Sequence, residues 1–370
     1  MIAPLIDHHA HPFPLTYQAF DPVEVTLDVA AGEQAEARRR RLGPGRLAIE
    51  MLQVRLAKQL GCEVAELSEA RAAAAADWPA YVAGLFSDVD LTGMLLDPGA
   101  ETFPEDGGVA PYAALAGAPM WELVRIEPLV DRMVEAGART AEIVAAVDDM
   151  LAAAAARGAV GAKTVLAYRT GLAVDPDAGL AAANSSLDSP LPVPQRGKAM
   201  RDLLFRHMLG TCSELKLPLQ VHTGFGDSEL QLSGANPLLL DPVLRTVEAE
   251  STKVVLIHGG FPWHEQVAYL AAVRPAVWVD FSLSNLVSPA TTADRFLRLI
   301  DLCPTGRLVV GSDGHGGPET HWFALSILRD AWAVVRERLT GPAREGWLDD
   351  AERAIFAGNV QQLYRLDGRV

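Results

Sequence analysis

The chain has 370 residues, of which 49% are hydrophobic and 21% charged, a composition that excludes general disorder and supplies a large packed core. Its formal net charge of −15 disfavours nonspecific binding to nucleic acid or to an anionic membrane surface, so we expect a small-molecule partner. The three widely spaced cysteines (Cys62, Cys212 and Cys303) do not form a disulfide framework, and no run reaches the ~18 apolar residues of a membrane helix, so we expect a cytoplasmic protein.

Short runs rich in Val, Ile and Leu alternate along the chain with helix-like segments rich in Ala, Leu, Arg and Glu. Such βα units pack as a parallel sheet, and eight of them close into a barrel. The sequence therefore predicts an α/β fold, a TIM (β/α)8 barrel that forms a single domain over residues 1–370. The predicted strands are Leu5–His11, Thr92–Asp97, Leu123–Leu129, Val160–Leu166, Leu219–Thr223, Val254–His258, Val277–Phe281 and Leu308–Ser312.

Two insertions interrupt this rhythm. Residues 15–91, between the first and second strands, are predicted to form a helical insertion that includes a helix over Leu47–Leu60. Its basic run Arg38–Arg41 is interpreted as a solvated helix face, which serves solubility or a contact between copies in a homo-oligomer. The second insertion, Val174–Gln195, follows the fourth strand and is rich in Pro, Asp, Ser and Asn, so we expect a long loop that borders the active site as a lid.

The helix predicted over Met200–Leu215 carries an apolar stripe. Its members are Leu204, Met208, Cys212 and Leu215. His207 lies off the stripe and is interpreted as a surface histidine.

The first strand ends in Asp7-His8-His9-Ala10-His11. Because side chains alternate between the faces of a strand, His9 and His11 are predicted to point into the mouth of the barrel, and His8 and Ala10 outward. Asp7 is either a partner behind the ligands or an ordinary strand carboxylate. Two imidazoles on one face can supply two ligands of a metal ion. A complete site needs further ligands from the ends of other strands.

Further donors follow later strands. His222 ends the fifth strand, His258 ends the sixth, and Asp313 follows the eighth. The carboxyl ends of all barrel strands surround one cavity, so these residues should meet there. The set His9, His11, His222 and Asp313 offers nitrogen and oxygen ligands suited to Zn²⁺ with a position open for water, which predicts a catalytic divalent-metal site.

Several of these motifs together resemble the amidohydrolase superfamily and, within it, the amidohydrolase-2 branch. They are His9-x-His11, Val221-His222-Thr223-Gly224, His258-Gly259-Gly260, Val279-Asp280-Phe281-Ser282, Gly311-Ser312-Asp313 and Gly358-Asn359 followed by Leu363-Tyr364. Ala162-Lys163-Thr164 and Tyr168-Arg169-Thr170-Gly171-Leu172 are similar to the amidohydrolase portion of FluG and nodulin/glutamine synthetase fusion proteins.

The resemblance implies roles for individual residues. Asp313 would act as metal ligand and general base, and His258 as an acid/base in a one-metal site, the default, or as a ligand of a second metal. Lys163 stands where binuclear members carry a carboxylated, bridging lysine; otherwise its ammonium binds a substrate carboxylate or is paired with a barrel carboxylate. Arg169 is expected either to grip a substrate carboxylate or to tie down the insertion.

The leading hypothesis is hydrolysis of an amide or related C–N bond in a small acidic substrate by a metal-activated water. The amidohydrolase-2 branch also includes nonoxidative decarboxylases, which gives the first alternative. A barrel without catalysis, retained as a binding or regulatory module, is the second.

Overall fold

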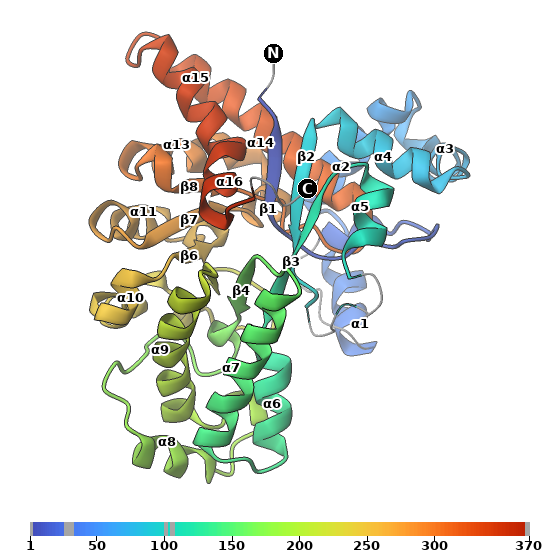
Figure 1. Cartoon of the computed structure of the whole chain (residues 1–370). Coiled ribbons are helices and arrows are strands. Elements are labelled where there is room, and N and C mark those ends of the chain that lie inside the picture. Colours follow the sequence, from blue (N-terminus) through green and yellow to red (C-terminus); the bar gives the residue numbers. More distant parts are fainter. Residues whose placement is uncertain (1–2, 26–32, 100–102, 104–107, 367–370) are drawn as a thin grey trace.

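The computed structural model describes residues 3–25, 33–99, 103 and 108–366, and its centre is a sheet of eight parallel strands in sequence order (Figure 1). Asp313 N donates a hydrogen bond to His9 O (2.8 Å) and His11 N donates one to Gly314 O (2.8 Å), which brings the last strand back to the first. The predicted TIM-barrel class is confirmed. The strands are β1 (Leu5–Ala10), β2 (Leu91–Leu96), β3 (Met120–Arg125), β4 (Gly161–Thr164), β5 (Leu219–His222), β6 (Val254–Ile257), β7 (Val277–Phe281) and β8 (Leu308–Val310).

Helices surround this barrel. They are α1 (Glu33–Leu42), α2 (Leu47–Leu60), α3 (Leu67–Ala74), α4 (Trp78–Asp88), α5 (Ala110–Ala116), α6 (Glu127–Glu135), α7 (Thr140–Ala156), α8 (Leu180–Leu187), α9 (Lys198–Leu215), α10 (Val247–Ser251), α11 (His264–Val273), α12 (Ser284–Val287), α13 (Thr292–Leu302), α14 (Pro318–Leu339), α15 (Glu345–Arg353) and α16 (Asn359–Tyr364). Among them, none is long and apolar enough to cross a membrane, a finding that covers the described part of the chain.

The strands are buried on both faces, which explains why they read as nearly continuous Val, Ile and Leu runs rather than as alternating ones. Their outward residues pack under the helices, and inward residues such as Leu95, Val255 and Val309 form a separate cluster with α16. Tyr364 of α16 lies against β4, where a Cβ on Gly161 would come within 2.8 Å of its ring. Glycine is therefore required at position 161 for α16 to close this end of the barrel.

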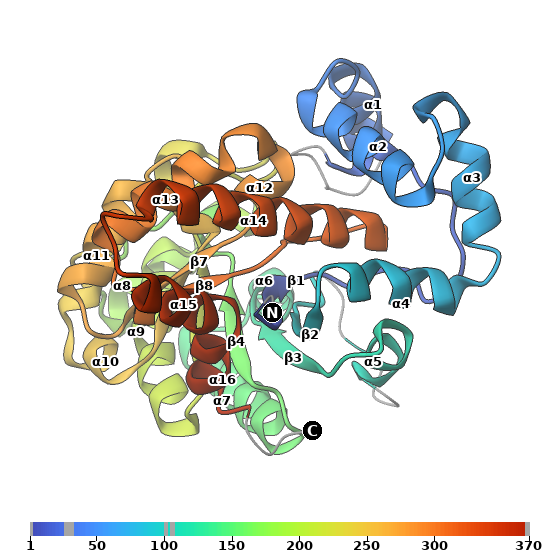
Figure 2. The same cartoon turned by 90° about the horizontal axis from the view of Figure 1, so that it is seen from above.

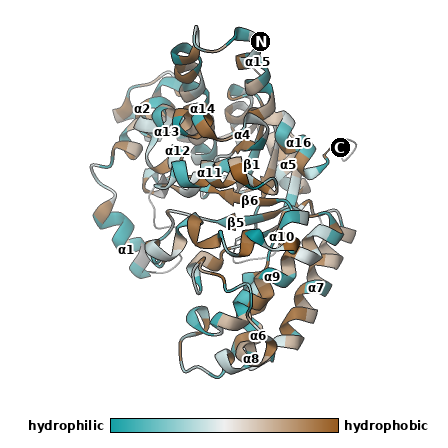
Figure 3. Cartoon of the chain, turned by 90° about the vertical axis from the view of Figure 1, so that its left-hand side faces the viewer, coloured by the Kyte–Doolittle hydropathy of each residue, from teal (hydrophilic) through white to brown (hydrophobic). Residues whose placement is uncertain are grey.

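The predicted helical insertion, residues 15–91, holds α1 to α4, which lie together along one side of the barrel (Figure 2), and its last residue, Leu91, already belongs to β2. The helix expected over Leu47–Leu60 has these bounds in the structure. Helix α1 is mostly hydrophilic (Figure 3), and its Arg40 pairs with Glu36 at 2.7 Å while both side chains stay more than half exposed. This arrangement agrees with a solvated basic face.

Two sequence-based expectations need correction. The third strand is β3, Met120–Arg125, rather than Leu123–Leu129, because Pro128 lies in the first turn of α6, where the missing N–H costs nothing. The insertion Val174–Gln195 is not simply a long loop, since it contains α8, which packs against α9.

Helix α9 buries the predicted stripe residues Leu204, Met208 and Cys212. His207 lies at the surface, where Nε2 contacts Asp148 Oδ2 of α7 at 2.8 Å. The interpretation of His207 as a surface histidine is confirmed.

Candidate metal centre

Metal-ligand atoms from three strand ends converge at the carboxyl-terminal mouth of the barrel. His9 Nε2 lies 3.2 Å from Asp313 Oδ1, and His258 Nδ1 lies 3.9 Å from Asp313 Oδ2. One ligand atom from each of these three residues lies within 4.8 Å of the others, a spacing that suits a shared ion. His11 Nε2 is 3.6 Å from Asp313 Oδ1, so His9 of β1 and His11, which follows β1, face the same carboxylate as predicted.

A second group of ligand atoms shares His9 and comprises His9, His11 and Asp97. Asp97 directly follows β2, as Asp313 closely follows β8, but it was predicted only as the last residue of a strand. Its position just past the buried run Met94-Leu95-Leu96 is the signal that could have identified it. Two overlapping groups in the described part of the chain leave both the one-metal and the two-metal arrangements open.

His222 lies beside these groups rather than inside them. Its Nδ1 is 3.0 Å from Nε2 of His258, and its ring packs edge-on against Tyr168 with centroids 4.8 Å apart. His258, which was predicted as an acid/base, therefore occupies the position next to Asp313 that the sequence assigned to His222. The ligand role of His222 stays a prediction that rests on its buried Nε2, which has no hydrogen-bond partner among the described residues.

Two residues of the centre have left-handed backbone conformations. His258 has φ 68° and Asp313 has φ 53°, in a region that costs a non-glycine residue roughly 1–2 kcal/mol. Asp313 is followed by Gly314, where a Cβ would meet the ring of His321 at 2.3 Å. The strand ends are thus bent to turn these two side chains into the mouth, and such strain is common at functional sites.

Burial sets the protonation of the candidate ligands. Burial and the nearby Lys163 ammonium lower the pKa of His9 to about 4, and burial holds the pKa values of His222 and His258 well below their usual range. For Asp313, burial opposes ionisation, but His258, His11 and His9 together hold its pKa well below the usual range. The centre therefore presents neutral imidazoles and a charged carboxylate, the forms that bind divalent metals.

The geometry around β1 fits a bound metal in a further respect. His11 Nδ1 donates a hydrogen bond to Asp97 O (3.0 Å), which fixes the ring and leaves Nε2 facing the centre. Because buried polar atoms are normally satisfied, the unpaired Nε2 of His222 also favours a missing partner at this place.

Lys163 points into the barrel from β4. Its Nζ lies 3.2 Å from His9 Nε2 and 3.5 Å from Asp97 Oδ2, and its side chain is 1% exposed. Burial lowers the pKa of Lys163 to about 8, a shift that Asp97 opposes and Arg125 reinforces. Of the three alternatives, the pairing with a barrel carboxylate is present, and the bridging and substrate-binding roles stay predictions.

Arg125, at the end of β3, was missed by the sequence analysis because the strand was placed too late. Its Nε and Nη2 contact the Asp97 carboxylate at 3.0 and 2.5 Å. Burial raises the cost of ionising Asp97, but Arg125 and Lys163 keep its pKa well below the usual range. Arg125 is thus the guanidinium that lies against the ligand groups.

Arg169 lies farther along the chain, beyond β4. Its Nη2 pairs with Asp131 Oδ2 of α6 at 2.8 Å, and Arg201 pairs with the other oxygen of Asp131 at 2.7 Å. This arrangement corresponds to the role of tying down the insertion, and substrate binding by Arg169 stays a prediction.

The residues below the centre correct the prediction for His8. In β1, Asp7 is opposite Met94 and Ala10 is opposite Leu96, so β1 has one extra residue there and the alternation of faces is broken. His8 is fully buried and points inward, where Gln220 of β5, across the barrel, lies 3.3 Å from its Nε2.

Two carboxylates hold the backbone of the centre. Asp7 accepts hydrogen bonds from Ser312 N (2.9 Å) and Ser312 Oγ (2.5 Å), directly before Asp313. Asp280 accepts one from His258 N (3.1 Å). Asp7 is therefore a partner behind the ligands, the first of its two alternatives.

Comparison with known proteins adds to this geometry. The sequence model of the amidohydrolase family matches residues 6–366. The fluG protein of Emericella nidulans is 31% identical over 190 residues, which are 48% of this chain and 22% of that protein, so the chain spans only about a fifth of this relative.

Among solved structures, a metal-dependent hydrolase from Lactobacillus casei superimposes with a TM-score of 0.82 at 23% identity, over 99% of this chain and 96% of that one. Uronate isomerase from Thermotoga maritima superimposes with a TM-score of 0.65 at 12% identity, over 98% and 94%. Glucuronate isomerase from Caulobacter crescentus gives 0.66 at 14% identity, over 100% and 92%. At these identities the structures share the fold, and the chemistry has to be argued from the site.

Proposed function

This chain belongs to the amidohydrolase family, and on that basis we propose that it is a metal-dependent hydrolase that cleaves an amide or related C–N bond in a small, carboxylate-bearing substrate. The observation that carries the proposal is the convergence of His9, His258 and Asp313 at the barrel mouth, with His11 and Asp97 in the adjoining group. Buried neutral imidazoles beside ionised carboxylates serve no packing purpose that apolar residues would not serve better.

His9, His11 and Asp313 are the proposed ligands, with His222 as the fourth and zinc as the preferred ion. A bound divalent ion would polarise the substrate carbonyl and lower the pKa of a water molecule. One ion is the default. Lys163 Nζ lies 3.2 Å from His9 Nε2, and a carboxylated Lys163 would supply a ligand that two metal ions could share.

Asp313 is the proposed general base. Its Oδ1 faces His9 and His11, and its Oδ2 faces His258, so one oxygen stays available for a proton while the other is held. The carboxylate takes a proton from the attacking water and passes it to the leaving nitrogen. His258 is the proposed acid/base. Ser282 Oγ holds its Nδ1 at 2.9 Å, so a hydrogen bond to the substrate oxygen would come from Nε2 and replace the 3.0 Å contact with His222.

The substrate's acid group requires a cation near the mouth. Lys163 and Arg125 lie against the ligand groups, and Arg169 lies beyond β4 on the same side. Lys163 and Arg125 share the single carboxylate of Asp97, and Arg169 and Arg201 share that of Asp131, so each group has one positive charge in excess. Arg169 and Lys163 are the proposed residues that bind the substrate carboxylate.

The test is turnover of N-acylated amino acids and dicarboxylic monoamides in ¹⁸O-labelled water. We expect one ¹⁸O atom in the carboxylate product of the wild-type protein and none with Asp313→Asn. Release of carbon dioxide without consumption of water would replace the proposal with the decarboxylase alternative. Absence of turnover in a metal-loaded protein, with tight binding of acidic ligands, would replace it with the non-catalytic barrel.

A further inference from the structure

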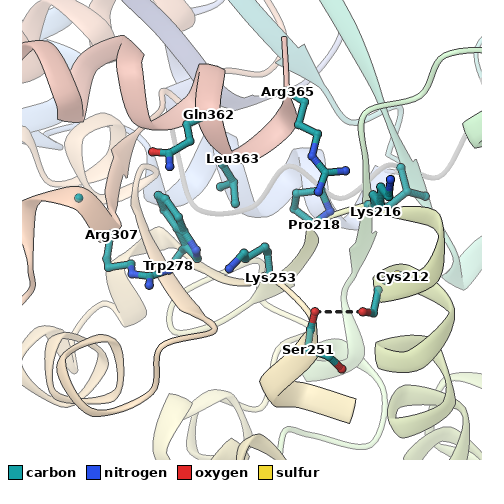
Figure 4. A pocket seen from close by; sticks show the side chains of 13 residues that line it. Cys212, Lys216, Pro218, Ser251, Lys253, Trp278, Arg307, Gln362, Leu363 and Arg365 are labelled. Carbon is teal, nitrogen blue, oxygen red and sulfur yellow. Dashed lines mark hydrogen bonds between the residues drawn. The ribbon is translucent and has the colours of Figure 1, made fainter. Parts of the chain in front are cut away.

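A cavity of about 340 Å³ lies at the other end of the barrel (Figure 4). It opens between the amino-terminal ends of β5 to β8 and helix α16, so the strands separate it from the metal centre. Its lining residues are Cys212, Ser213, Lys216, Leu217, Pro218, Ser251, Lys253, Trp278, Gly306, Arg307, Gln362, Leu363 and Arg365.

Among the described residues, the lining of this cavity, called here the basic pocket, has four cations and no carboxylate. The cations are Lys216, Lys253, Arg307 and Arg365. The chain as a whole is strongly acidic, with 47 Asp and Glu against 32 Lys and Arg, and most of its structured arginines have carboxylate partners. Within the described ranges, none of these four cations has a carboxylate partner, so the basic pocket gathers positive charge that no carboxylate of the described chain compensates.

Two of the four cations occupy costly backbone positions. Lys216 ends α9 with φ 59° and Arg365 ends α16 with φ 54°, at C-cap sites where glycine is usual. The left-handed conformation destabilises a non-glycine residue by roughly 1–2 kcal/mol. The interaction of a cation with the helix dipole offsets only about 0.3–1 kcal/mol of this cost. Folding alone would favour glycine at both sites, which points to another use for the side chains.

The wall of the pocket is rigid. Trp278 of β7 is 4% exposed, and the Arg307 guanidinium lies over its ring at 5.0 Å. This stacking holds the Arg307 guanidinium in place, and its N–H groups form no ion pair with a carboxylate of the described residues. A preorganised guanidinium loses little entropy when it binds an anion.

The cations also repel one another. Partial burial, together with Arg307 and Arg365, lowers the pKa of Lys253. A ligand with negative charge would remove this repulsion, so binding and folding would stabilise each other.

We propose that the basic pocket binds a small molecule with at least two negative charges, carried on phosphate or carboxylate groups. Its volume lies at the lower end of the range for small-molecule sites, which excludes large ligands. Two guanidinium groups and two ammonium groups can give two-pronged and single contacts to such oxyanions. The site is independent of the proposed hydrolase activity, because no residue is shared with the metal centre.

The experiment is calorimetric titration of the full chain at pH 8 and constant ionic strength, with inorganic phosphate in one arm and tricarballylate in the other. We expect saturable binding of at least one anion and a rise in Tm. Lys253→Gln and Arg365→Gln should each weaken binding about tenfold or more, as loss of a charge-assisted contact does. Lys58→Gln, an exposed lysine on α2, is the matched control and should bind like the wild type.

The two arms identify the ligand class: binding of phosphate alone assigns phosphate groups, and binding of tricarballylate alone assigns carboxylates. Asp313→Asn should bind as the wild type does, which separates this site from anions held at the metal centre. Failure of both anions to bind, or equal weakening by Lys58→Gln, would overturn the proposal. A mass that rises with protein concentration and no anion binding would also overturn it, in favour of an interface between copies.

Discussion

Asp97→Asn is the change that most directly tests the electrostatic account of the barrel mouth. The Asp97 carboxylate is fully buried and accepts hydrogen bonds from Gly99 N (3.0 Å) and from Arg125 Nη2 (2.5 Å), with Lys163 Nζ at 3.5 Å. Asparagine has nearly the same shape but no charge. The substitution therefore leaves Arg125 and Lys163, with side chains 17% and 1% exposed, as cations without their carboxylate.

Removal of one partner from a buried ion pair costs about 3–5 kcal/mol, because the remaining charge is left uncompensated. With an entropy of unfolding of about 2.1 cal/mol/K per residue, a chain of 370 residues has about 0.8 kcal/mol/K. Asp97→Asn should thus lower Tm by about 4–6 °C in differential scanning calorimetry. Because Asp97 belongs only to the second ligand group, a two-metal centre should lose one ion in this variant and a one-metal centre should keep its ion.

The matched control is Asp188→Asn. Asp188 pairs with Arg139 at 2.7 Å, but the side chains are 66% and 46% exposed, so the pair is worth about 0–1 kcal/mol and the expected shift is about 1 °C or less. Equal shifts in Tm for the two variants would refute the reasoning.

Three further predictions concern the backbone, pH and substrate binding. Gly224→Ala should destabilise the protein by about 2–3 kcal/mol in urea unfolding, because Gly224 has φ 76° and a Cβ would meet Phe261 O at 2.3 Å. Gly210→Ala in α9, where a Cβ meets nothing within 4 Å, should stabilise the protein by up to about 1 kcal/mol. The opposite order of stabilities would contradict the close packing at Gly224. Burial lowers the pKa of His264 to about 4, so the folded state resists protonation of this ring, and His264 alone should remove about 3 kcal/mol of stability as pH falls from 6.5 to 4. His264→Gln should lose less stability than the wild type over this range, and an identical pH profile would count against a buried neutral ring. Arg169→Ala should raise KM about tenfold for acidic substrates but not for neutral amides, and unchanged KM for both would leave the residue as a structural ion pair.

Much of the barrel could be predicted because its strands are short buried runs bounded by Gly, Pro and Asp. The apolar run Val277–Phe281 coincides with β7. The third strand was placed wrongly because Leu129 and Val130 continue the apolar pattern, although both belong to α6, where Val130 is buried and Leu129 is partly buried against the core. An apolar run alone does not distinguish a strand from a helix face, and Pro128 was the feature that could have done so.

The candidate site could be predicted only in part, since strand ends can be found in the sequence and distances cannot. His9, His11 and Asp313 meet as expected because all barrel strands end at one mouth. The inward orientation of His8 depends on the extra residue in β1, which the alternation rule does not include. The position of His258 beside Asp313 depends on its left-handed backbone, which no spacing in the sequence discloses.

Metal stoichiometry tests the central claim most directly. Elemental analysis of protein purified without chelators should give about one zinc ion per chain, or two if mass spectrometry shows that Lys163 is carboxylated. The variants His9→Ala and Asp313→Asn should lose the ion while keeping a native circular dichroism spectrum. A wild-type protein without divalent metal, or variants that retain it in full, would contradict the assignment of this centre.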